Sequence, residues 1–361
     1  MLRGFHEIAG QRNWLVLNVQ GPEGVVEAVR SWDPHVCVVG PVMYANSPQE
    51  VWADRRVIGM NVHSRLAEIP AVRSDDRLIG AEAATHLLAK GFKTFSTFAI
   101  NHYPWSDERC DGFIQTVTAA SGRVVDPLYL NGDNTQLSMD QQAAVWLRAL
   151  PKGTAVIATC DEWGAILVLA CRLAGIAVPE DVAVIGVDDD DLVCEMCQPH
   201  MSSVRIPWQE IGRTTARMVE SVLRTDKSPM KIVRLPPSGV VERRSTELLA
   251  AGHPVVVQAL RYLRSQAHEP INVQDVVHQV TTNRRWLERA FRTHLGRSIL
   301  QEIRRAHMDR ARHLLATTRQ PMTAIARSCG FGSAIARFSR TFNKDVGMTP
   351  SAYRRKFSLN R

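Results

Sequence analysis

The chain of 361 residues has no run of about 18 consecutive apolar residues, the length that a membrane-spanning helix needs. Its first residues, Met1 to Ile8, also lack the apolar stretch of a secretory signal peptide. We therefore expect neither a membrane span nor a membrane partner.

Cysteines are scarce and show no pairing pattern. There are seven of them, an odd number, scattered between Cys37 and Cys329. Scattered thiols are typical of a reducing compartment, so we expect the protein to act in the cytoplasm. Cys194 and Cys197 form a single CxxC motif, and without a second pair nearby it is weak evidence for zinc binding or redox chemistry. We expect no metal site.

Several catalytic and nucleotide-binding motifs are missing. The sequence contains no G-x-G-x-x-G, P-loop, G-x-S-x-G or H-E-x-x-H, so nucleotide binding and hydrolysis lack their characteristic residues. The consecutive aspartates from Asp188 to Asp191 suggest Mg²⁺ binding, but consecutive side chains cannot all face one ion. We expect no cofactor and no enzymatic activity.

Charge is unevenly distributed along the chain. From Pro254 to Arg361 there are 20 lysines and arginines against 6 acidic residues, a net charge of +14. Since the whole chain carries +8, residues 1–253 carry −6. A strongly basic C-terminal region on a mildly acidic body points to nucleic acid as a partner.

This basic region contains one structural pattern twice, about fifty residues apart. Ile271–Phe291 and Met322–Phe342 each predict a short helix, a tight turn, a polar N-cap and a second helix. The two N-caps are Asn283 and Ser333. This is the helix-turn-helix pattern, whose second helix lies in the DNA major groove.

The second helix of each unit is expected to be amphipathic, at about 100° per residue. In the first, Leu287, Ala290 and Phe291 share the inward side. In the second, Ile335, Phe338 and Phe342 do so. Arginines on the opposite side can hold a guanine or a phosphate, although such a face can also be merely solvated. The candidate DNA-binding residues are Arg284, Arg285, Trp286, Arg289, Arg337, Arg340 and Lys344.

The C-terminal hundred residues resemble the AraC/XylS family of bacterial transcription regulators. The segments that carry the likeness are Leu287–Phe291, Ala311–Leu315, Gly330-Phe331, Phe338–Arg340 and Thr349–Arg354. The resemblance implies two helix-turn-helix units held by a helix near 299–316 and reading successive major grooves of a double-stranded operator.

Two details of this region are open to test. Ile303, His307, Ala311 and Leu314 should form the buried stripe of the 299–316 helix, with His307 as a core residue rather than a ligand. One residue more than the family spacing separates Gly330-Phe331 from Phe338–Arg340. Either the turn bulges or the recognition helix starts one residue later.

Residues 1–250 alternate between short apolar strands and helices, which predicts parallel sheets covered on both faces. There are too many units for one sheet, so we expect two α/β lobes. The expected strands are Trp14–Val19, His35–Val39, Val57–Val62, Phe95–Ile100, Ala155–Thr159, Val182–Val187 and Lys231–Leu235. The expected helices span about 23–30, 76–90, 105–120, 136–149, 161–174 and 208–224.

Ligands of such folds bind beyond the carboxyl ends of strands, here in a cleft between lobes. Carboxylates, an arginine and an aromatic ring suit a sugar, which has many hydroxyls and an apolar C–H face. The same residues have a simpler explanation, since Asp161 could cap the helix that it begins.

This part of the chain resembles the LacI/GalR-type, periplasmic-binding-protein-like effector domain. The likeness rests on Asp75-Asp76, Glu108-Arg109, Ala158–Asp161, Val178–Asp188 and Ile211-Gly212. It implies that Arg109, Asp161 and Asp188 hold a sugar on which Trp105 stacks. The family's first strand has no counterpart, because Met1 falls within the first helix. We expect the true start to lie upstream; otherwise a partner chain supplies the edge or the lobe tolerates the gap.

Together these observations predict an effector domain at 1–247, a linker at 248–254 and a DNA-binding domain at 255–361. The fold class is a two-lobed α/β domain followed by an all-α domain. The combined resemblance implies a homodimeric activator that acts with RNA polymerase and responds to a xylose-like monosaccharide. The alternatives are a DNA-binding regulator with a degenerate effector domain and, less favoured, a sugar-modifying enzyme.

Overall fold

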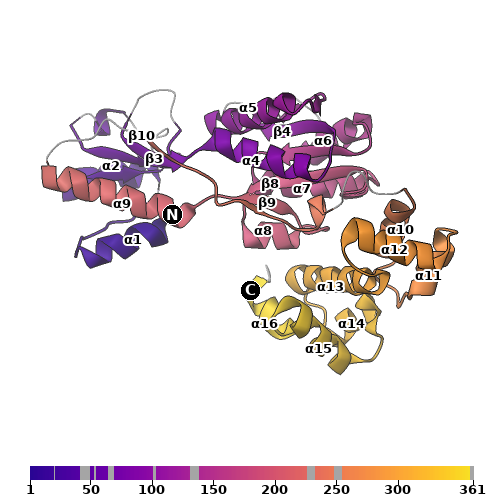
Figure 1. Ribbon diagram of the computed structural model, residues 1–361. Coiled ribbons are helices and arrows are strands. Elements are labelled where there is room, and N and C mark those ends of the chain that lie inside the picture. Colours follow the sequence, from indigo (N-terminus) through magenta and orange to yellow (C-terminus); the bar gives the residue numbers. More distant parts are fainter. Residues whose placement is uncertain are drawn as a thin grey trace. The chain divides into compact units, whose positions relative to one another are not determined.

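The computed structural model describes residues 1–19, 21–40, 49–52, 54–63, 69–100, 103–130, 138–225, 232–247 and 254–357 (Figure 1). The chain divides into two compact units. The first comprises Met1–Glu82, Asn101–Phe113 and Arg205–Gly239, and the second comprises Ala83–Ile100, Ile114–Val204 and Val240–Arg361.

The first unit is built on a parallel sheet with the strand order β1-β2-β3-β10. Its strands are β1 (Cys37–Val39), β2 (Val57–Met60), β3 (Ala71–Ser74) and β10 (Ile232–Leu235). Its helical elements are α1 (Leu2–Gln11), α2 (Pro22–Trp32), the short η1 (Gln49–Val51) and α9 (Trp208–Thr225). Asp75 N–H donates to the Leu235 carbonyl at 2.9 Å, which continues the pairing of β3 with β10 into the start of the next helix.

Helices α1 and α9 lie against each other at very short range (Figure 1). A Cβ on Gly4 would stand 2.0 Å from the carbonyl oxygen of Gln209, and one on Gly212 would stand 2.1 Å from that of Met1. Glycine is therefore required on both helices, because any side chain there would force the backbones apart.

The expected strand at Trp14–Val19 is wrong. These residues form neither helix nor strand, and the side chains of Leu15 and Leu17 are 82% and 46% exposed. A strand needs a neighbour that accepts and donates its ladder hydrogen bonds. Among the described residues no strand pairs with this segment, so its β propensity alone does not produce a strand.

The second unit contains the larger sheet, with the strand order β11-β9-β8-β7-β4-β5 and β6 also paired with β4. Its strands are β4 (Thr94–Ile100), β5 (Arg123–Val124), β6 (Leu128–Leu130), β7 (Thr154–Ala158), β8 (Val182–Asp188), β9 (Ser202–Arg205) and β11 (Val240–Val241). The helices around it are α4 (Asp76–Ala89), α5 (Pro104–Ala119), α6 (Met139–Ala149), α7 (Asp161–Leu173), α8 (Asp191–Met196) and the short η2 (Arg244–Thr246); α4 and α5 begin in the first unit. Every residue of β7 is buried, and α6 and α7 share its apolar core.

In the described residues 254–357, all regular elements are helices, as expected. It comprises α10 (Pro254–Ser265), α11 (Val273–Gln279), α12 (Arg284–Leu295), α13 (Ile299–Thr317), α14 (Met322–Ala326), η3 (Arg327–Phe331), α15 (Ile335–Val346) and α16 (Pro350–Phe357). The predicted α/β region followed by two helix-turn-helix units is therefore confirmed. The pairs are α11–α12 and α14–α15 (Figure 1).

Helix α13 joins the two helix-turn-helix units through their cores. Its N-terminal half gives Ile299 and Ile303 to the apolar cluster around α11 and α12. Its C-terminal half gives Met308 and Leu315 to the cluster around α14, α15 and α16. Since one continuous helix contributes to both cores, the predicted role of the 299–316 helix is confirmed.

The extra residue in the second helix-turn-helix both widens the turn and delays the start of the recognition helix. The turn widens into η3, where Gly330 has φ +75°, and α15 then begins only at Ile335. Its N-cap position falls on Ala334, whose side chain accepts no hydrogen bond. The predicted cap at Ser333 is therefore wrong. Ile335 is 37% exposed, so its predicted inward position is wrong as well.

Candidate DNA interface and effector site

Helix α12 presents the predicted basic face. The Asn283 side chain accepts hydrogen bonds from the backbone N–H groups of Arg285, at 2.8 Å, and Trp286, at 3.3 Å, so the helix starts where the sequence predicts. Leu287, Ala290 and Phe291 are buried. Arg285 and Arg289 are exposed on the opposite side. Arg284 is also exposed and forms an ion pair with Glu288 at 3.1 Å within the helix.

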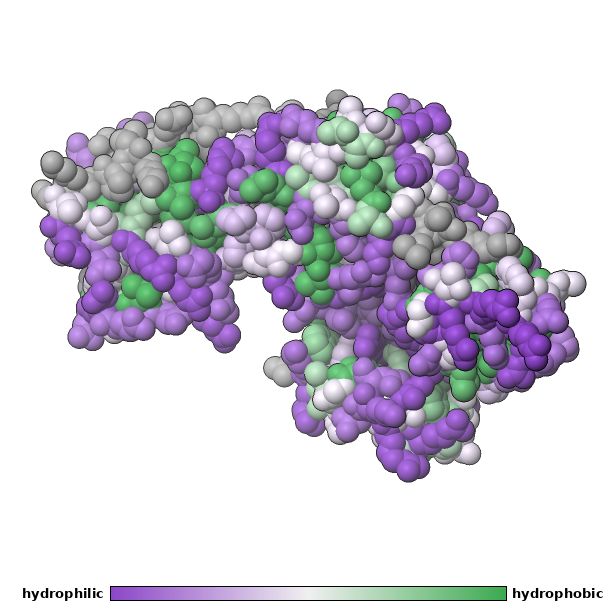
Figure 2. Space-filling view, in the orientation of Figure 1, coloured by the Kyte–Doolittle hydropathy of each residue, from purple (hydrophilic) through white to green (hydrophobic). Residues whose placement is uncertain are grey.

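Helix α15 repeats this arrangement. Phe338 and Phe342 are fully buried, whereas Arg337, Arg340 and Lys344 are exposed. Two contacts between Arg304 of α13 and the carboxylate of Asp345, at 2.6 and 2.5 Å, fasten the end of α15 to α13. Figure 2 shows strongly hydrophilic surface over α12 and α15. All of the predicted DNA-contacting arginines are therefore available to phosphates or base edges.

In the first unit, two of the predicted sugar residues lie together on α5. The Arg109 guanidinium carbon stands 4.6 Å from the centre of the Trp105 ring, a cation–π contact. Arg109 is itself buried, and its Nε donates to the Asp76 carboxylate at 2.8 Å. The pair is close because α4 and α5 cross through Gly80 and Gly112, each facing a backbone carbonyl of the other helix.

Sequence reasoning missed the polar residues that surround this pair. Ser74 Oγ donates to the Asp76 carboxylate at 3.2 Å, and Asn61 Oδ1 accepts from the Ser74 N–H at 3.1 Å. The His63 Nδ1 lies 3.3 Å from Asp76 Oδ2. Burial and the charges of Arg73 and Arg109 lower the pKa of His63 to about 3, so its ring is neutral. The sequence did carry a signal for these residues, because Asn61, His63 and Ser74 each end or follow a strand, where ligand-binding residues are expected.

The other two predicted sugar residues lie in the second unit, at the carboxyl ends of adjacent strands. Asp188 is the last residue of β8, with φ +117°, and Asp161 opens α7 directly after β7. The Asp161 carboxylate accepts from Ser203 Oγ at 2.6 Å and from the Asp190 N–H at 2.8 Å. It therefore holds the turn that follows Asp188 and does not cap its own helix.

Burial makes the carboxyl group of Asp161 an unusually weak acid. Loss of solvent raises the pKa of this carboxyl to about 6, despite the hydrogen bonds that favour its charged form. The Cys194 thiol also donates to it, at 3.4 Å. Burial raises the pKa values of both Cys194 and Cys197, so neither thiol is activated as a nucleophile.

The aspartates Asp189 and Asp190 of the run 188–191 contact different partners and do not converge on one point. Asp189 pairs with Arg243 at 2.8 Å. The Asp190 carboxylate caps α8 by accepting from the N–H groups of Leu192 and Val193. Within the described ranges, no group of three or more His, Cys, Asp or Glu side chains is placed to hold a metal ion.

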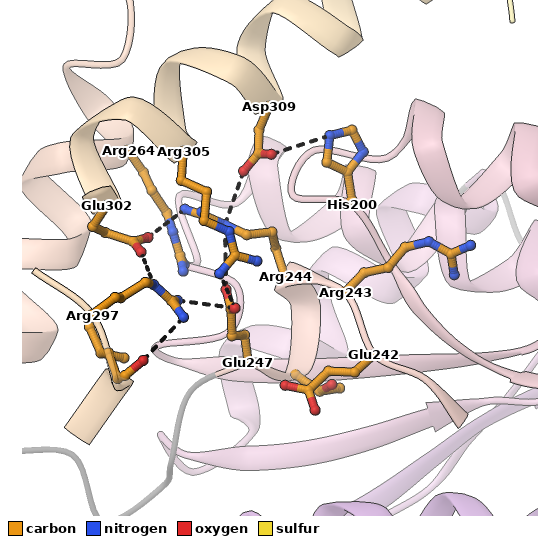
Figure 3. Close-up of polar contacts among 12 residues, drawn as sticks. His200, Glu242, Arg243, Arg244, Glu247, Arg264, Arg297, Glu302, Arg305 and Asp309 are labelled. Atoms are coloured by element: carbon orange, nitrogen blue, oxygen red, sulfur yellow. Dashed lines mark hydrogen bonds and ion pairs between the residues drawn. The ribbon is translucent and has the colours of Figure 1, made fainter. Parts of the chain in front are cut away.

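A buried ion-pair network, not anticipated from the sequence, connects the α/β part of the second unit to α13 (Figure 3). Arg244, in the segment after the last strand, lies 2.9 Å from Glu302 and 3.1 Å from Asp309. Arg297 pairs with Glu302 at 2.5 Å and with Glu247 at 3.0 Å. Since Arg244 and Glu302 are nearly inaccessible to solvent, removing either one would leave a buried charge without its partner.

Comparison with known proteins identifies both parts. Residues 84–246 match a periplasmic binding protein-like domain, and residues 276–356 match a helix-turn-helix domain. Within the part of the chain that the structure describes, no helix is long and apolar enough to cross a membrane.

Similar proteins extend over most of the chain. The xylose operon regulatory protein of Haemophilus influenzae is 31% identical over 293 residues, covering 79% of this chain and 74% of that protein. The protein of the same name from Escherichia coli K12 is 29% identical over 310 residues, covering 83% and 79%. A solved structure of a xylose-binding transcription activator has a TM-score of 0.67 and 25% identity, covering 99% of this chain and 94% of the other. The chain therefore belongs to the family of the xylose operon regulatory proteins, and it is a sugar-responsive, DNA-binding transcription regulator rather than an enzyme.

Proposed function

We propose that this regulator activates a sugar-utilisation operon as a homodimer in the cytoplasm, acting with RNA polymerase and responding to xylose or a closely related monosaccharide. The observation that carries the proposal is a buried ion-pair network that connects the α/β part of the second unit to α13, the helix that packs in the cores of both helix-turn-helix units. The names of the relatives and of the solved neighbour support xylose among the possible sugars.

The proposed division of the chain keeps the effector domain at 1–247, the linker at 248–254 and the DNA-binding domain at 255–361. In the DNA-binding domain, Arg284, Arg285, Trp286 and Arg289 serve one half-site. Arg337, Arg340 and Lys344 serve the other, about one helical turn away.

For the sugar we propose that Trp105 stacks on the C–H face and that Arg109, Asp161 and Asp188 bind hydroxyls. Arg109 already pairs with Asp76, and Asp161 already accepts hydrogen bonds within the protein. Each carboxylate oxygen has more than one acceptor position, so a sugar hydroxyl can bind without displacing these internal partners. The existing contacts then orient the groups before the sugar arrives.

Calorimetric titration with D-xylose, D-ribose, L-arabinose and D-glucose tests the proposal directly. We expect xylose to bind most tightly and to change the protein's affinity for DNA in a mobility-shift assay. Asp161→Asn should weaken sugar binding, whereas Glu162→Gln, the exposed neighbour on α7, should not. Binding of DNA without binding of any of these sugars would instead favour a regulator with a degenerate effector domain.

A further inference from the structure

The proposed sugar residue Asp188 is followed by a second residue in a strained conformation. Asp189 has φ +54°, a region that costs a non-glycine residue on the order of 1–3 kcal/mol. The turn is held from inside, because the Asp189 N–H donates to Ser203 Oγ at 3.0 Å. Two consecutive residues with positive φ, fixed by hydrogen bonds, make the end of β8 a defined turn that a bound sugar would contact directly.

Arg243 connects this turn to helix α8. Its guanidinium contacts Asp189 at 2.8 Å on one side and Glu195 of α8 at 3.7 Å on the other. It is 10% exposed and also donates to the Met201 carbonyl at 3.2 Å, so it has little freedom to move by itself. Figure 3 shows that Arg243 and its neighbour Arg244 extend to different sides of their segment. Arg244 contacts Glu302 of α13, and Arg243 contacts Asp189, the neighbour of the proposed sugar residue Asp188.

Glu195 continues the connection into the DNA-binding region. Its Oε2 accepts a hydrogen bond from the Tyr353 hydroxyl at 2.9 Å, across 158 positions of sequence. Tyr353 lies on α16 and is 2% exposed. Its ring meets that of Phe342 edge to face, with 5.5 Å between the centres. Phe342 is on the buried side of α15, the recognition helix of the second helix-turn-helix.

We propose that Asp189, Arg243, Glu195 and Tyr353 form a relay through which sugar binding at Asp188 changes the position of recognition helix α15. The proposal rests on the proposed sugar-binding function. Each contact joins groups of opposite charge or a donor with an acceptor, and the last one ends in the packed core beneath α15. A change in the Asp188–Asp189 turn therefore reaches the DNA-reading helix through a continuous set of contacts rather than through the solvent.

The ion pairs of Arg244 with Glu302 and Asp309 form a clamp next to the relay, and His200 lies between the two, 3.7 Å from Glu195 and 3.8 Å from Asp309. The clamp fixes the α/β part to α13, the helix that both helix-turn-helix units share. The relay enters the DNA-binding region at α16, where Tyr353 packs in the core of the second helix-turn-helix with Phe342 of α15 and with Met308 and Leu315 of α13. We therefore expect it to alter the second helix-turn-helix relative to the first, which changes how well the two fit successive major grooves.

Two variants interrupt the relay at different contacts. Tyr353→Phe keeps the ring in its core and removes only the hydroxyl. Arg243→Gln removes the charge between Asp189 and Glu195. The matched control is Arg261→Gln, which breaks the 2.5 Å pair of Arg261 with Asp181 between α10 and the α/β part, away from the relay.

The measurement is the affinity for double-stranded DNA, selected by the protein from a random pool, without and with saturating D-xylose. Coupled sites typically change each other's affinity by about 5–150-fold, and the effect is reciprocal. We expect wild type and Arg261→Gln to share one ratio in this range. In Tyr353→Phe and Arg243→Gln the ratio should fall to within about twofold of 1, with the xylose Kd of Tyr353→Phe kept within about threefold of wild type. Calorimetric xylose titrations with and without DNA should give the same ratios.

The outcomes distinguish the relay from the function on which it rests. Full wild-type ratios in both Tyr353→Phe and Arg243→Gln would overturn the relay while leaving the sugar response intact. Loss of the ratio in Arg261→Gln as well would overturn it too, because any weakening of the contact between the two parts would then suffice. A wild-type protein that binds none of the four sugars would overturn the proposed function, and the relay with it.

Discussion

Arg244 and Glu302 form an ion pair, 2.9 Å between Nη2 and Oε1, that is almost completely shielded from solvent. One residue follows the last strand of the α/β part and the other lies on α13 (Figure 3). Burial by itself would raise the pKa of Glu302, but the charges of Arg244 and Arg297 outweigh it and lower the pKa to about 2. The carboxylate is therefore ionised wherever the protein is folded near neutral pH.

Glu302→Gln should destabilise the second unit, because it leaves Arg244 and Arg297 without their shared carboxylate. Removing one partner of a buried pair costs about 3–5 kcal/mol. Urea unfolding measures the loss, with Glu288→Gln as the control. Glu288 pairs with Arg284 on an exposed helix face, where a pair is worth less than about 1 kcal/mol.

The advantage of wild type over Glu302→Gln should also depend on pH. Since the folded pKa lies below the ordinary 4.5, the advantage is complete above pH 4.5 and disappears as the pH falls toward 2. An advantage that stayed constant down to pH 2 would show that Glu302 is not ionised in the folded protein.

Gly330→Ala should destabilise the second helix-turn-helix. Gly330 has φ +75°, and an added Cβ would stand 2.7 Å from the His307 ring. The Nε2–H group of that ring donates a 3.0 Å hydrogen bond to the Glu269 carbonyl, so the ring cannot move away freely. We expect a loss of about 1–3 kcal/mol from the backbone strain alone, and more from the contact.

Gly347→Ala provides the comparison, and thermal unfolding measures the loss of stability in both variants. Gly347 has φ +78° at the end of α15, but nothing lies within 4 Å of its added Cβ. Gly347→Ala therefore measures the backbone strain of a positive φ without a steric clash of the added Cβ. Equal losses in the two variants would mean that the His307 ring does not restrict the turn.

Substitutions in the two recognition helices should affect different base pairs. Arg285→Ala or Arg289→Ala should relax specificity at one half-site, at a cost of about 1–3 kcal/mol for each lost bidentate base contact. Arg337→Ala or Arg340→Ala should do so about 10 bp away. Footprinting on DNA with single base changes measures which base pairs lose specificity in each variant. Arg12→Ala, which removes an arginine paired with Glu220 in the first unit, controls for the loss of one charge. Overlapping effects of the two sets would contradict the two-groove arrangement.

Asp161 should titrate near pH 6, where few carboxyl groups do. Its folded pKa is raised above the ordinary 3.8 to about 6 by burial. The folded state therefore favours the protonated form more than the unfolded chain does, and this contribution to stability is complete below pH 3.8 and lost as the pH rises through 6. Carbon-13 NMR of the carboxyl measures the pKa directly, and Asp161→Asn should remove the pH dependence of stability in this window. A pKa below 4 would show that the hydrogen bonds from Ser203 and Asp190 outweigh burial.

The amino-acid sequence alone determined the elements and faces that depend on neighbouring residues. The spacing of Leu287, Ala290 and Phe291 places one side of α12 in the core whatever it packs against, and Asn283 caps the helix through N–H groups two and three residues away. The buried strands β7 and β8 and the role of His307 followed from the same local patterns. The contribution of α13 to both helix-turn-helix cores could likewise be predicted, because its apolar residues recur along one side.

Tertiary structure decided whatever depends on residues far apart in the chain. Trp14–Val19 has the composition of a strand, but among the described residues no strand lies beside it to pair with. Ser333 has the chemistry of a cap but stands one residue too early. The pairing of Arg109 with Asp76 spans 33 positions, and the contact of Tyr353 with Glu195 spans 158. No local pattern encodes such partners, because an arginine on an amphipathic segment looks the same whether its carboxylate is water-exposed or buried. Only the packing of α13 and α16 against the α/β part places Arg244 and Glu195 among the residues that join the two.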